Sequence, residues 1–544
     1  MHSKTSPVFL IVCALASVGI PLASEAGAHQ PAQPRAVAEA GSYREPFRPQ
    51  FHFTPERNWM NDPNGMVFFD REYHLFYQYN PWGDKWGHMS WGHAVSRDLV
   101  HWEHLPVALL EEDGVMIFSG SAVVDWKNTS GFGVSGKPPL VAIYTGHYTG
   151  KPLQNQHVAY STDRGRTWTK YPGNPVLDIG DKDFRDPKVF WHEPTRRWVM
   201  VVAWPVVRKV RLYASPDLKQ WTHLSDFGPA GSITGIWECP DLFPLIVEGR
   251  PRRQGWVLVV NVGGGAPAGG SGAQYFVGNF DGARFTQDQG VGPAAQQPSA
   301  SQGRRPTEFK SGETLWADYG RDFYAAVSWS DVPKSDGRRL WIGWMSNWEY
   351  AQDVPTAPWR SAMTVPRQLS LRATPEGLRL IQQPVRELRK LRTAHRRRKG
   401  LSLDQANAWL AVDGPGPREL LIDFAPGSAR RFGLKLGHGG DQATIITCDS
   451  GDGRLSLDRR RSGLTGFHPA FVGAHEAPLR LRDGRIRLHI LVDTSSVEIF
   501  ANDGETVITD LVFPDINSLG WECFSDADDI RILSADVWRL KSAW

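Results

Sequence analysis

Short apolar runs recur along most of the chain, and each is bounded by glycine, proline, aspartate or asparagine. They are five to seven residues long and include 65–69, 73–79, 119–124, 140–145, 198–204, 211–215 and 256–262. Runs of this length between turn-forming residues are typical of β-strands and too short for most helices. The pattern therefore predicts an all-β protein.

A ten-residue pattern, Ser-x-Asp-Leu-x-x-Trp-x-His-Leu, begins at Ser96 and again at Ser215, with a looser copy at Ser161. An aspartate in this position accepts hydrogen bonds from a turn, and the tryptophan can pack between neighbouring units. The copies are 65 and 54 residues apart, a little above the ~40 to 50 residues of common propeller blades. About five such units fill residues 49–371, which predicts a five-bladed β-propeller with loop-rich blades.

The pattern changes after residue 371. Leucine and arginine spacing over 372–400 suits a short helix or an extended connector, and its eight basic residues between Arg386 and Lys399 read as a solvated face. Short strands resume over 401–544, with an Asn502-Asp503-Gly504 turn between alternating flanks. This second domain is predicted to be a β-sandwich.

The N-terminus has a basic start, a 15-residue apolar run from Val8 to Leu22 and an Ala-x-Ala site ending at Ala28. This predicts a secretory signal over 1–28, followed by a proline-rich linker over 29–48, and hence a secreted or periplasmic protein. Removal of the signal leaves Cys239, Cys448 and Cys523. Three cysteines cannot all be paired in a disulfide framework, although a single Cys448–Cys523 disulfide is still possible.

The composition of the chain limits the kinds of ligand and partner that the protein is expected to bind. Of the 544 residues, 41% are hydrophobic, and 61 basic against 58 acidic residues give a formal net charge of +3. No basic surface calls for nucleic acid or an anionic membrane, so a neutral ligand is expected. The 23 tryptophans suit stacking on sugar faces, although such rings also fill cores. No metal or cofactor is expected, because the histidines lack zinc-binding spacing and the glycine-rich stretch from Asn261 lacks a P-loop ending.

Three acids stand in unusual settings. Asp62 opens Asp-Pro-Asn-Gly, which by itself predicts a tight turn, yet it follows a Trp-Met pair. Asp186 precedes a proline, and Glu238 stands one residue before Cys-Pro. Because a residue before proline avoids the α region, Asp62 and Asp186 are expected to be extended. Each acid alone could equally serve a turn or a buried ion pair.

The spacings of 124 and 52 residues place the three acids on different propeller blades, which converge on a central axis. Three converging carboxyl groups are what glycosyl transfer requires. Arg185 is expected to keep the neighbouring Asp186 ionised, and the apolar neighbours Trp237 and Cys239 suit Glu238 to act as a general acid.

The segments "WMNDPNG", "FRDP" and "WECPD" resemble the three signature boxes of glycoside hydrolase family 32, the β-fructofuranosidases, and "VDTSSVEIFANDG" resembles the sandwich domain of that family. The resemblance implies a five-bladed propeller joined to a β-sandwich and retaining hydrolysis through a covalent fructosyl-enzyme. It assigns Asp62 as nucleophile, Glu238 as acid/base and Asp186 as transition-state stabiliser.

The same boxes imply a fructose subsite. Its lining would be Asn61, Gln78, Trp86, Phe118, Ser119 and Arg185, of which Trp86 and Phe118 could equally be packing residues. The stretch from Trp344 is similar to exo-acting inulinases and levanases, so Trp348 and Tyr350 would stack on a sugar beyond the cleavage point, although tryptophan-rich strands also fill cores.

Three other functions stay open at this stage. A fructosyltransferase would use the same acids, a fructan-binding module would bind without turnover, and a sialidase is suggested by "STDRGRTW" at Ser161. The sequence does not distinguish inulin, levan and sucrose as substrates, nor does it determine the oligomeric state.

Overall fold

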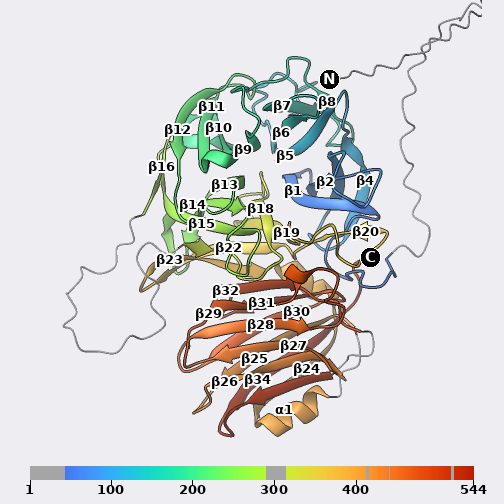
Figure 1. Cartoon of the computed structure of the whole chain (residues 1–544). Coiled ribbons are helices and arrows are strands. Elements are labelled where there is room, and N and C mark those ends of the chain that lie inside the picture. The colour runs from blue at the N-terminus through green and yellow to red at the C-terminus, as the bar shows by residue number, and fades with distance from the viewer. Residues whose placement is uncertain (1–42, 289–313, 412–415, 440, 516–519) are drawn as a thin grey trace, which may run out of the picture. The chain divides into compact units, whose positions relative to one another are not determined.

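The computed structural model describes residues 43–288, 314–411, 416–439, 441–515 and 520–544 (Figure 1). The predicted signal, 1–28, and most of the predicted linker lie outside these ranges. The last linker residues, 43–48, pack against the folded chain: Tyr43 stacks on Trp544 with ring centroids 4.2 Å apart, and the buried Arg48 donates a 2.8 Å hydrogen bond to Thr54. No helix within the described ranges is long and apolar enough to cross a membrane.

The first part of the described chain forms five antiparallel blades, each with four main strands, which confirms the prediction of a five-bladed propeller (Figure 1). The fourth and fifth blades are joined into one sheet by the pairing of Val247 with Leu371. The first strands of the blades contact one another around the centre. The first blade holds β1 (Asn58–Phe69), β2 (Glu72–Tyr79), β3 (Ser90–Ser96) and β4 (Trp102–Leu109), and the second holds β5 (Val115–Val124), β6 (Leu140–Tyr148), β7 (Gln154–Ser161) and β8 (Thr169–Lys170). The third holds β9 (Arg185–His192), β10 (Arg197–Trp204), β11 (Lys209–Ser215) and β12 (Thr222–Phe227), and the fourth holds β13 (Trp237–Val247), β14 (Arg250–Val262), β15 (Gly272–Phe280) and β16 (Phe285–Gln287). The fifth holds β18 (Tyr324–Ser328), β19 (Arg339–Met345), β22 (Arg367–Thr374) and β23 (Gly377–Pro384).

Shorter elements complete this domain. The strands β17 (Leu315–Trp316), β20 (Trp359–Arg360) and β21 (Ala362–Met363) pair with β15, β1 and β19. Two 3-10 helices, η1 (Glu193–Thr195) and η2 (Pro205–Val207), precede β10 and β11 in the described chain.

The repeated Ser-x-Asp pattern forms the hairpin between the third and fourth strands of the first three blades. Asp98, Asp163 and Asp217 each accept hydrogen bonds from backbone N–H groups of the turn that follows. Trp168, from the second blade, packs edge-on against Phe76 of the first, with centroids 5.5 Å apart. The predicted roles of the aspartate and the tryptophan are both confirmed.

A β-bulge interrupts the pairing of every innermost strand near its beginning. The interruptions fall at 60–63 in β1, 118–120 in β5, 185–188 in β9, 238–241 in β13 and 324–327 in β18. A bulge bends its strand and re-aims a side chain. Five bulges at the same level therefore turn side chains from all blades toward the axis.

The bulge in β1 explains why the predicted turn at Asp62 is wrong. The Asp-Pro-Asn-Gly segment lies inside a strand that continues to Phe69, because pairing with β2 outweighs the local turn preference. Gly65 has a φ of +57°, and a Cβ atom there would lie 2.7 Å from the rings of Phe76 and Trp91. Glycine thus allows the strand to bend past these rings.

Residues 372–400, predicted as a connector, hold paired strands. The last residues of β22 and all of β23 belong to the fifth blade, and the 3-10 helix η3 (Arg386–Leu391) leads into β24 (Arg392–Leu401), which pairs with β34. The basic face of β24 is largely exposed because the strand lies at a sheet edge, where charges prevent further pairing.

The C-terminal domain consists of two antiparallel sheets in the described residues, which confirms the predicted β-sandwich. A continuous core of aliphatic and aromatic side chains from both sheets is fully buried. One sheet holds β24, β34 (Arg531–Leu540), β25 (Arg418–Ala425), β30 (Ile486–Val492), β31 (Ser496–Ala501) and β32 (Thr506–Leu511); the other holds β29 (Ala474–Pro478), β28 (Arg454–Arg461), β27 (Gln442–Asp449), β26 (Arg431–Gly439) and β33 (Gly520–Ser525). The helix α1 (Leu403–Leu410) and the 3-10 helix η4 (Pro469–Phe471) complete the domain as described.

The three described cysteines are all free thiols. Cys448 lies on β27 and Cys523 on β33, and β26 runs between these two strands. Two strand spacings separate them by roughly 10 Å, which exceeds the reach of a disulfide. The Cys448–Cys523 bridge is therefore absent.

A buried ionic network joins the two domains. His52, at the start of the propeller, contacts Asp493 through Nδ1 and Glu498 through Nε2, both at 2.8 Å. Glu498 also accepts a hydrogen bond from Arg367. Burial by itself lowers the pKa of His52, but the two carboxylates outweigh it and raise that pKa from 6.5 to about 9. His52 is therefore an imidazolium at neutral pH.

We expect the stability of the chain to fall as pH rises through about 9. Because the folded pKa of His52 is raised, its contribution is complete below pH 6.5 and is lost as the imidazolium deprotonates. The contribution is about 3 kcal/mol at neutral pH. Urea unfolding of the wild type and His52→Gln between pH 6 and 10 measures it: the two curves should converge at high pH, and parallel curves would contradict the assignment.

Candidate active site

The three candidate acids lie on the innermost strands of three blades, each within or beside a bulge. Asp62 is on β1, Asp186 on β9 and Glu238 on β13. Asp62 and Asp186 are 8% and 6% exposed, whereas the Glu238 side chain is 18% exposed. The bulges thus bring three carboxyl groups together, and Glu238 is the one most open to solvent.

Cys239 connects two of these acids. Its thiol lies 3.4 Å from Oδ2 of Asp62 and 3.6 Å from Oδ2 of Asp186, in position to donate to either. Its backbone N–H donates a 2.9 Å hydrogen bond to the same oxygen of Asp186. Burial, followed by the neighbouring carboxyl groups, raises the pKa of the thiol well above its ordinary value. The thiol therefore stays protonated and remains a donor.

The backbone is strained at two of these positions. Asp186 has a φ of +67° and Cys239 a φ of +44°, although each precedes a proline. The expectation of an extended Asp186 is therefore wrong. Its N–H donates a 3.0 Å hydrogen bond to Oγ1 of Thr145 on the next blade, so tertiary contacts hold a conformation that the local sequence disfavours.

The surroundings of Glu238 also differ from the sequence expectation. Nε of Arg185 donates to its Oε1 over 2.9 Å, and the hydroxyl of Tyr324 on β18 donates to its Oε2. Because successive residues of a strand face opposite sides, the carboxyl points away from the apolar Trp237. Glu238 is thus held by two polar donors rather than by its apolar neighbours in the chain.

Electrostatics at the site are dominated by burial. Burial, followed by the charge of Glu238, raises the pKa values of Asp62 and Asp186. Arg185 was expected to keep Asp186 ionised, but its hydrogen bonds reach Glu238, Gln154 and Asp183, and the pKa of Asp186 is raised overall. Carboxylates that lie close together and are shielded from water repel one another. The cluster of three carboxyl groups therefore tends to keep a proton near neutral pH.

Four polar residues of the predicted subsite lie around the acids. Ser119 on β5 donates a 2.8 Å hydrogen bond to Oδ2 of Asp62, and the amide of Asn61 donates to Oδ1 over 3.1 Å. Arg185 contacts Glu238 as described above. Gln78 is buried and its amide donates to the backbone oxygen of Ile117, which ties β2 to β5. Three of the four thus contact an acid directly.

The predicted aromatic residues divide into two groups. Trp86 is 40% exposed and lies edge-on to Phe118, with centroids 6.1 Å apart. Trp348 is partly buried and stacks at 6.1 Å on Trp59, whose indole N–H donates to Asn61. Trp86, Phe118 and Trp348 therefore keep part of their ring surface exposed.

Tyr350 is not exposed in this way. Its side chain is 1% exposed, and its hydroxyl donates a 2.5 Å hydrogen bond to Asp322 and accepts one of 2.9 Å from Arg459 of the sandwich. The prediction that Tyr350 stacks on a sugar is corrected: a ring with no open face anchors the two domains instead.

Two residues at the site had no assigned function in the sequence. The sequence marks Cys239 only as an unpaired cysteine and as an apolar neighbour of Glu238, and it gives Tyr324 no role. The cysteine-proline pair beside Glu238 is a local signal for an irregular strand, whereas nothing local marks Tyr324. Among the described residues, no group of three or more histidine, cysteine or acidic side chains is arranged to hold a metal ion.

We expect Cys239→Ala to lower kcat about 3- to 10-fold, because loss of one hydrogen bond near the reacting atoms costs about 1 kcal/mol. Cys239→Ser should stay within about threefold of the wild type, since a hydroxyl also donates. Initial rates on a fructoside measure both. Equal losses in the two variants would show that thiol size, and not donation, matters.

Comparison with known proteins identifies the family. Residues 52–384 match the model for the "Glycosyl hydrolases family 32 N-terminal domain", and 387–539 match "Glycosyl hydrolases family 32 C terminal". A levanase of Bacillus subtilis (strain 168) is 50% identical over 514 residues, covering 93% of this chain and 72% of the levanase. An extracellular exo-inulinase of Aspergillus ficuum is 39% identical over 540 residues, with coverage of 93% and 97%.

Solved structures agree with this match. The exo-inulinase from Aspergillus awamori superposes with a TM-score of 0.82 at 36% identity, over 92% of this chain and all of that one. A β-fructofuranosidase from Schwanniomyces occidentalis complexed with fructosyl-erythritol has a TM-score of 0.78 at 32% identity, with coverage of 91% and 98%. With both family models matched and the three acids at the meeting point of the blades, the chain belongs to glycosyl hydrolase family 32.

Proposed function

We propose that this protein is a retaining glycoside hydrolase that releases terminal β-D-fructose from fructans, including inulin and levan, and from sucrose. The observation that carries the proposal is the cluster of Asp62, Asp186 and Glu238, in which one cysteine links the two buried acids and two donors hold the third. Levanases and exo-inulinases among the relatives support the choice of substrate.

In the proposed reaction Asp62 is the nucleophile. The donors Ser119, Asn61 and Cys239 stabilise its ionised form and fix its orientation. Attack of Asp62 on the anomeric carbon forms a covalent fructosyl-enzyme, and water then releases fructose with retention of configuration. Asp186, buried beside it, holds hydroxyl groups of the sugar and stabilises positive charge as it develops.

Glu238 is the proposed acid/base. It gives a proton to the leaving oxygen in the first step and takes one from water in the second. Arg185 and Tyr324, which donate to its two oxygens, stabilise the carboxylate that remains after the proton has left. Its greater exposure suits the side from which the leaving group departs and water enters.

The proposed activity is tested by a chromatographic time course of products from inulin, levan and sucrose. Fructose as the sole early product from the polymers is expected. Early oligosaccharides would mean endo cleavage, transfer products growing at high sucrose would mean a fructosyltransferase, and binding without turnover would mean a fructan-binding protein. Release of sialic acid from a chromogenic sialoside, with fructans left intact, would favour a sialidase.

Azide separates the roles of the two reacting acids. With an activated aryl β-fructoside, azide should accelerate Glu238→Ala at least about tenfold and yield β-fructosyl azide, because Asp62 still forms the intermediate and azide needs no base. Asp62→Ala should give no β-product. A β-azide from Asp62→Ala, or none from Glu238→Ala, would reverse or remove these assignments.

We infer further that the protein acts outside the cytoplasm. The signal-like pattern over 1–28 and the extracellular exo-inulinases among the relatives support this. N-terminal sequencing of protein from the culture medium and from the periplasm should find the chain starting after Ala28, and would show in which compartment it works. Retention of the full N-terminus in the cytoplasm would contradict it.

A further inference from the structure

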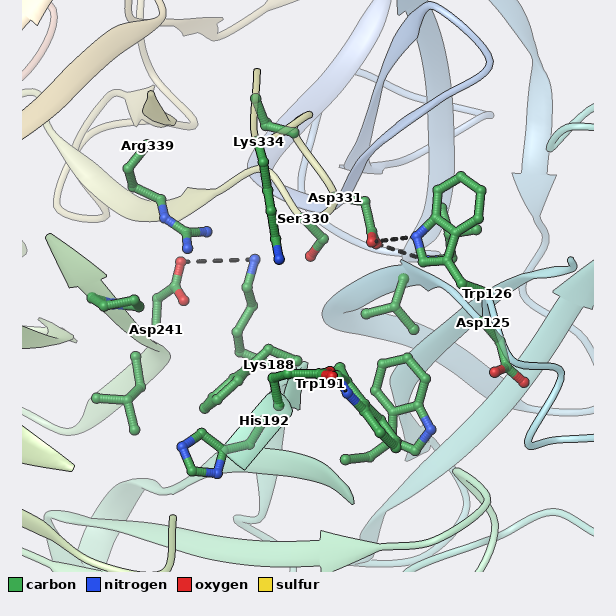
Figure 2. A pocket seen from close by; sticks show the side chains of 18 of the residues that line it. Asp125, Trp126, Lys188, Trp191, His192, Asp241, Ser330, Asp331, Lys334 and Arg339 are labelled. Atoms are coloured by element: carbon green, nitrogen blue, oxygen red, sulfur yellow. Dashed lines mark hydrogen bonds and ion pairs between the residues drawn. The ribbon is translucent and has the colours of Figure 1, made fainter. Parts of the chain in front are cut away.

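A cavity lies at the end of the propeller axis away from the acids, where the innermost strands end. Figure 2 shows side chains that line it. Along β9, Lys188 follows Asp186 by two residues, and along β13, Asp241 follows Glu238 by three, so each lies farther along its strand than its acid. Both line the cavity, which measures about 840 Å³. Ligand sites span roughly 300 to 1,000 Å³, so this volume can hold an oligosaccharide.

Lys188 and Asp241 separate the cavity from the active site. The ammonium group of Lys188 donates to the backbone oxygen of Ser328 and lies 3.7 Å from Oδ2 of Asp241. The N–H of Ser328 donates a 2.7 Å hydrogen bond to that same oxygen. The cavity is therefore a compartment of its own rather than an extension of the fructose subsite.

An indole ring is held in place at the cavity wall. Trp126 is 61% exposed, although its Nε1 donates a 2.9 Å hydrogen bond to Oδ1 of Asp331. Asp331 also accepts a 2.9 Å hydrogen bond from the N–H of Val124. Trp191 lines the same space (Figure 2). An orientation fixed by a partly buried carboxylate, combined with an exposed ring face, is what a stacking platform requires.

Polar groups whose hydrogen-bonding capacity is not satisfied point into the same cavity. Oδ1 of Asp241 is fully buried and has no hydrogen-bond partner among the described residues. The guanidinium of Arg339 has no carboxylate within ion-pairing distance in the described chain, and its hydrogen bond to the oxygen of Trp329 is long, at 3.4 Å. Figure 2 shows Arg339 and Lys334 directed toward the space that Lys188 and Asp241 share. An acceptor without a partner, Oδ1 of Asp241, and the donors of Arg339 and Lys334 therefore face one cavity.

We propose that this cavity is a second binding site for a neutral oligosaccharide, which stacks on Trp126 and hydrogen-bonds Asp241 and Arg339. Sugar hydroxyl groups both donate and accept, so they can satisfy the carboxylate and the guanidinium together. An anionic ligand would be repelled by Asp241 and Asp331, and a cationic ligand would be repelled by Arg339 and Lys188. The mixed charges thus favour a neutral ligand.

Titration calorimetry on the full chain tests this site. Asp62→Ala serves as background to prevent turnover, and the probes are an inulin-type tetrasaccharide, a choice that rests on the proposed function, and maltotetraose. We expect two inulin-type tetrasaccharides per chain. Adding Trp126→Ala should weaken one site about tenfold, whereas Leu481→Ala, at another exposed apolar residue, in the sandwich, should change neither. Binding of either sugar that responds to Trp126 supports the proposal.

Either of two results would overturn it: no binding of either sugar that responds to Trp126→Ala, or binding of inorganic phosphate in the cavity with neither sugar bound there. Hydrolysis is measured separately on Trp126→Ala in the otherwise native chain, where sucrose turnover should match the wild type. A chain that fails to hydrolyse fructans but binds a sugar at Trp126 would refute the proposed function alone, and the reverse result would refute the second site alone.

Discussion

Asp62→Ala should lower kcat on sucrose on the order of 10⁴-fold or more, while the dissociation constant for sucrose changes little. Loss of a nucleophile removes the covalent route altogether, and such losses reach ~10⁴ to 10⁶ in other hydrolases. The sugar is held mainly by neighbouring donors, so binding survives. Stopped assays and calorimetric titration with sucrose measure the two quantities.

Two variants serve as controls for this result. Ser119→Ala removes only the 2.8 Å hydrogen bond to Asp62 and should cost about tenfold. Asp98→Asn, in a hairpin on the same blade, should leave kcat unchanged. Undiminished hydrolysis by Asp62→Ala would remove that residue from its role, and a matching loss in Asp98→Asn would indicate misfolding instead.

Arg367→Met should destabilise the chain by about 3 to 5 kcal/mol. The Arg367 side chain is fully buried and holds Asp318 at 3.1 Å together with Glu498, two buried carboxylates from different parts of the chain. It also lies over the rings of Phe323 and Phe500, 4.6 and 5.0 Å from their centroids. Removing the cation leaves both carboxylates buried without their main partner. Urea unfolding at pH 7 measures the loss.

Arg372→Met is the matched control. This arginine lies on the same strand and pairs at 2.6 Å with Glu248, but the side chains are 16% and 35% exposed. Water compensates there for the lost pair, so the cost should stay near 1 kcal/mol or less. Equal losses in the two variants would show that the buried network contributes no more than a surface pair.

Local patterns in the sequence were sufficient for the architecture. Strand length and turn residues indicated an all-β chain, and the Ser-x-Asp repeat marked equivalent hairpins in three blades because its hydrogen bonds are made within a few residues. The positions of Asp62, Asp186 and Glu238 on separate blades also followed from their spacing.

Predictions about side-chain environment were less successful, because neighbours in a strand do not share surroundings. The apolar residues beside Glu238 suggest an apolar pocket, yet its carboxyl faces Arg185 and Tyr324 on the two neighbouring blades. Tyr350 was placed at the sugar, although it packs against Arg459, 109 residues away in the chain.

By itself, the sequence determined the fold class and the number of blades and predicted that three acids converge, since these depend on periodicity, turn chemistry and spacing along the chain. Only the tertiary structure decided how the acids are held. Bulges formed by cross-strand pairing re-aim them, positive φ angles at Asp186 and Cys239 are imposed by contacts between blades, and the cavity beyond Lys188 exists because five strands meet at one axis. Such contacts join residues far apart in sequence, and no local pattern encodes them.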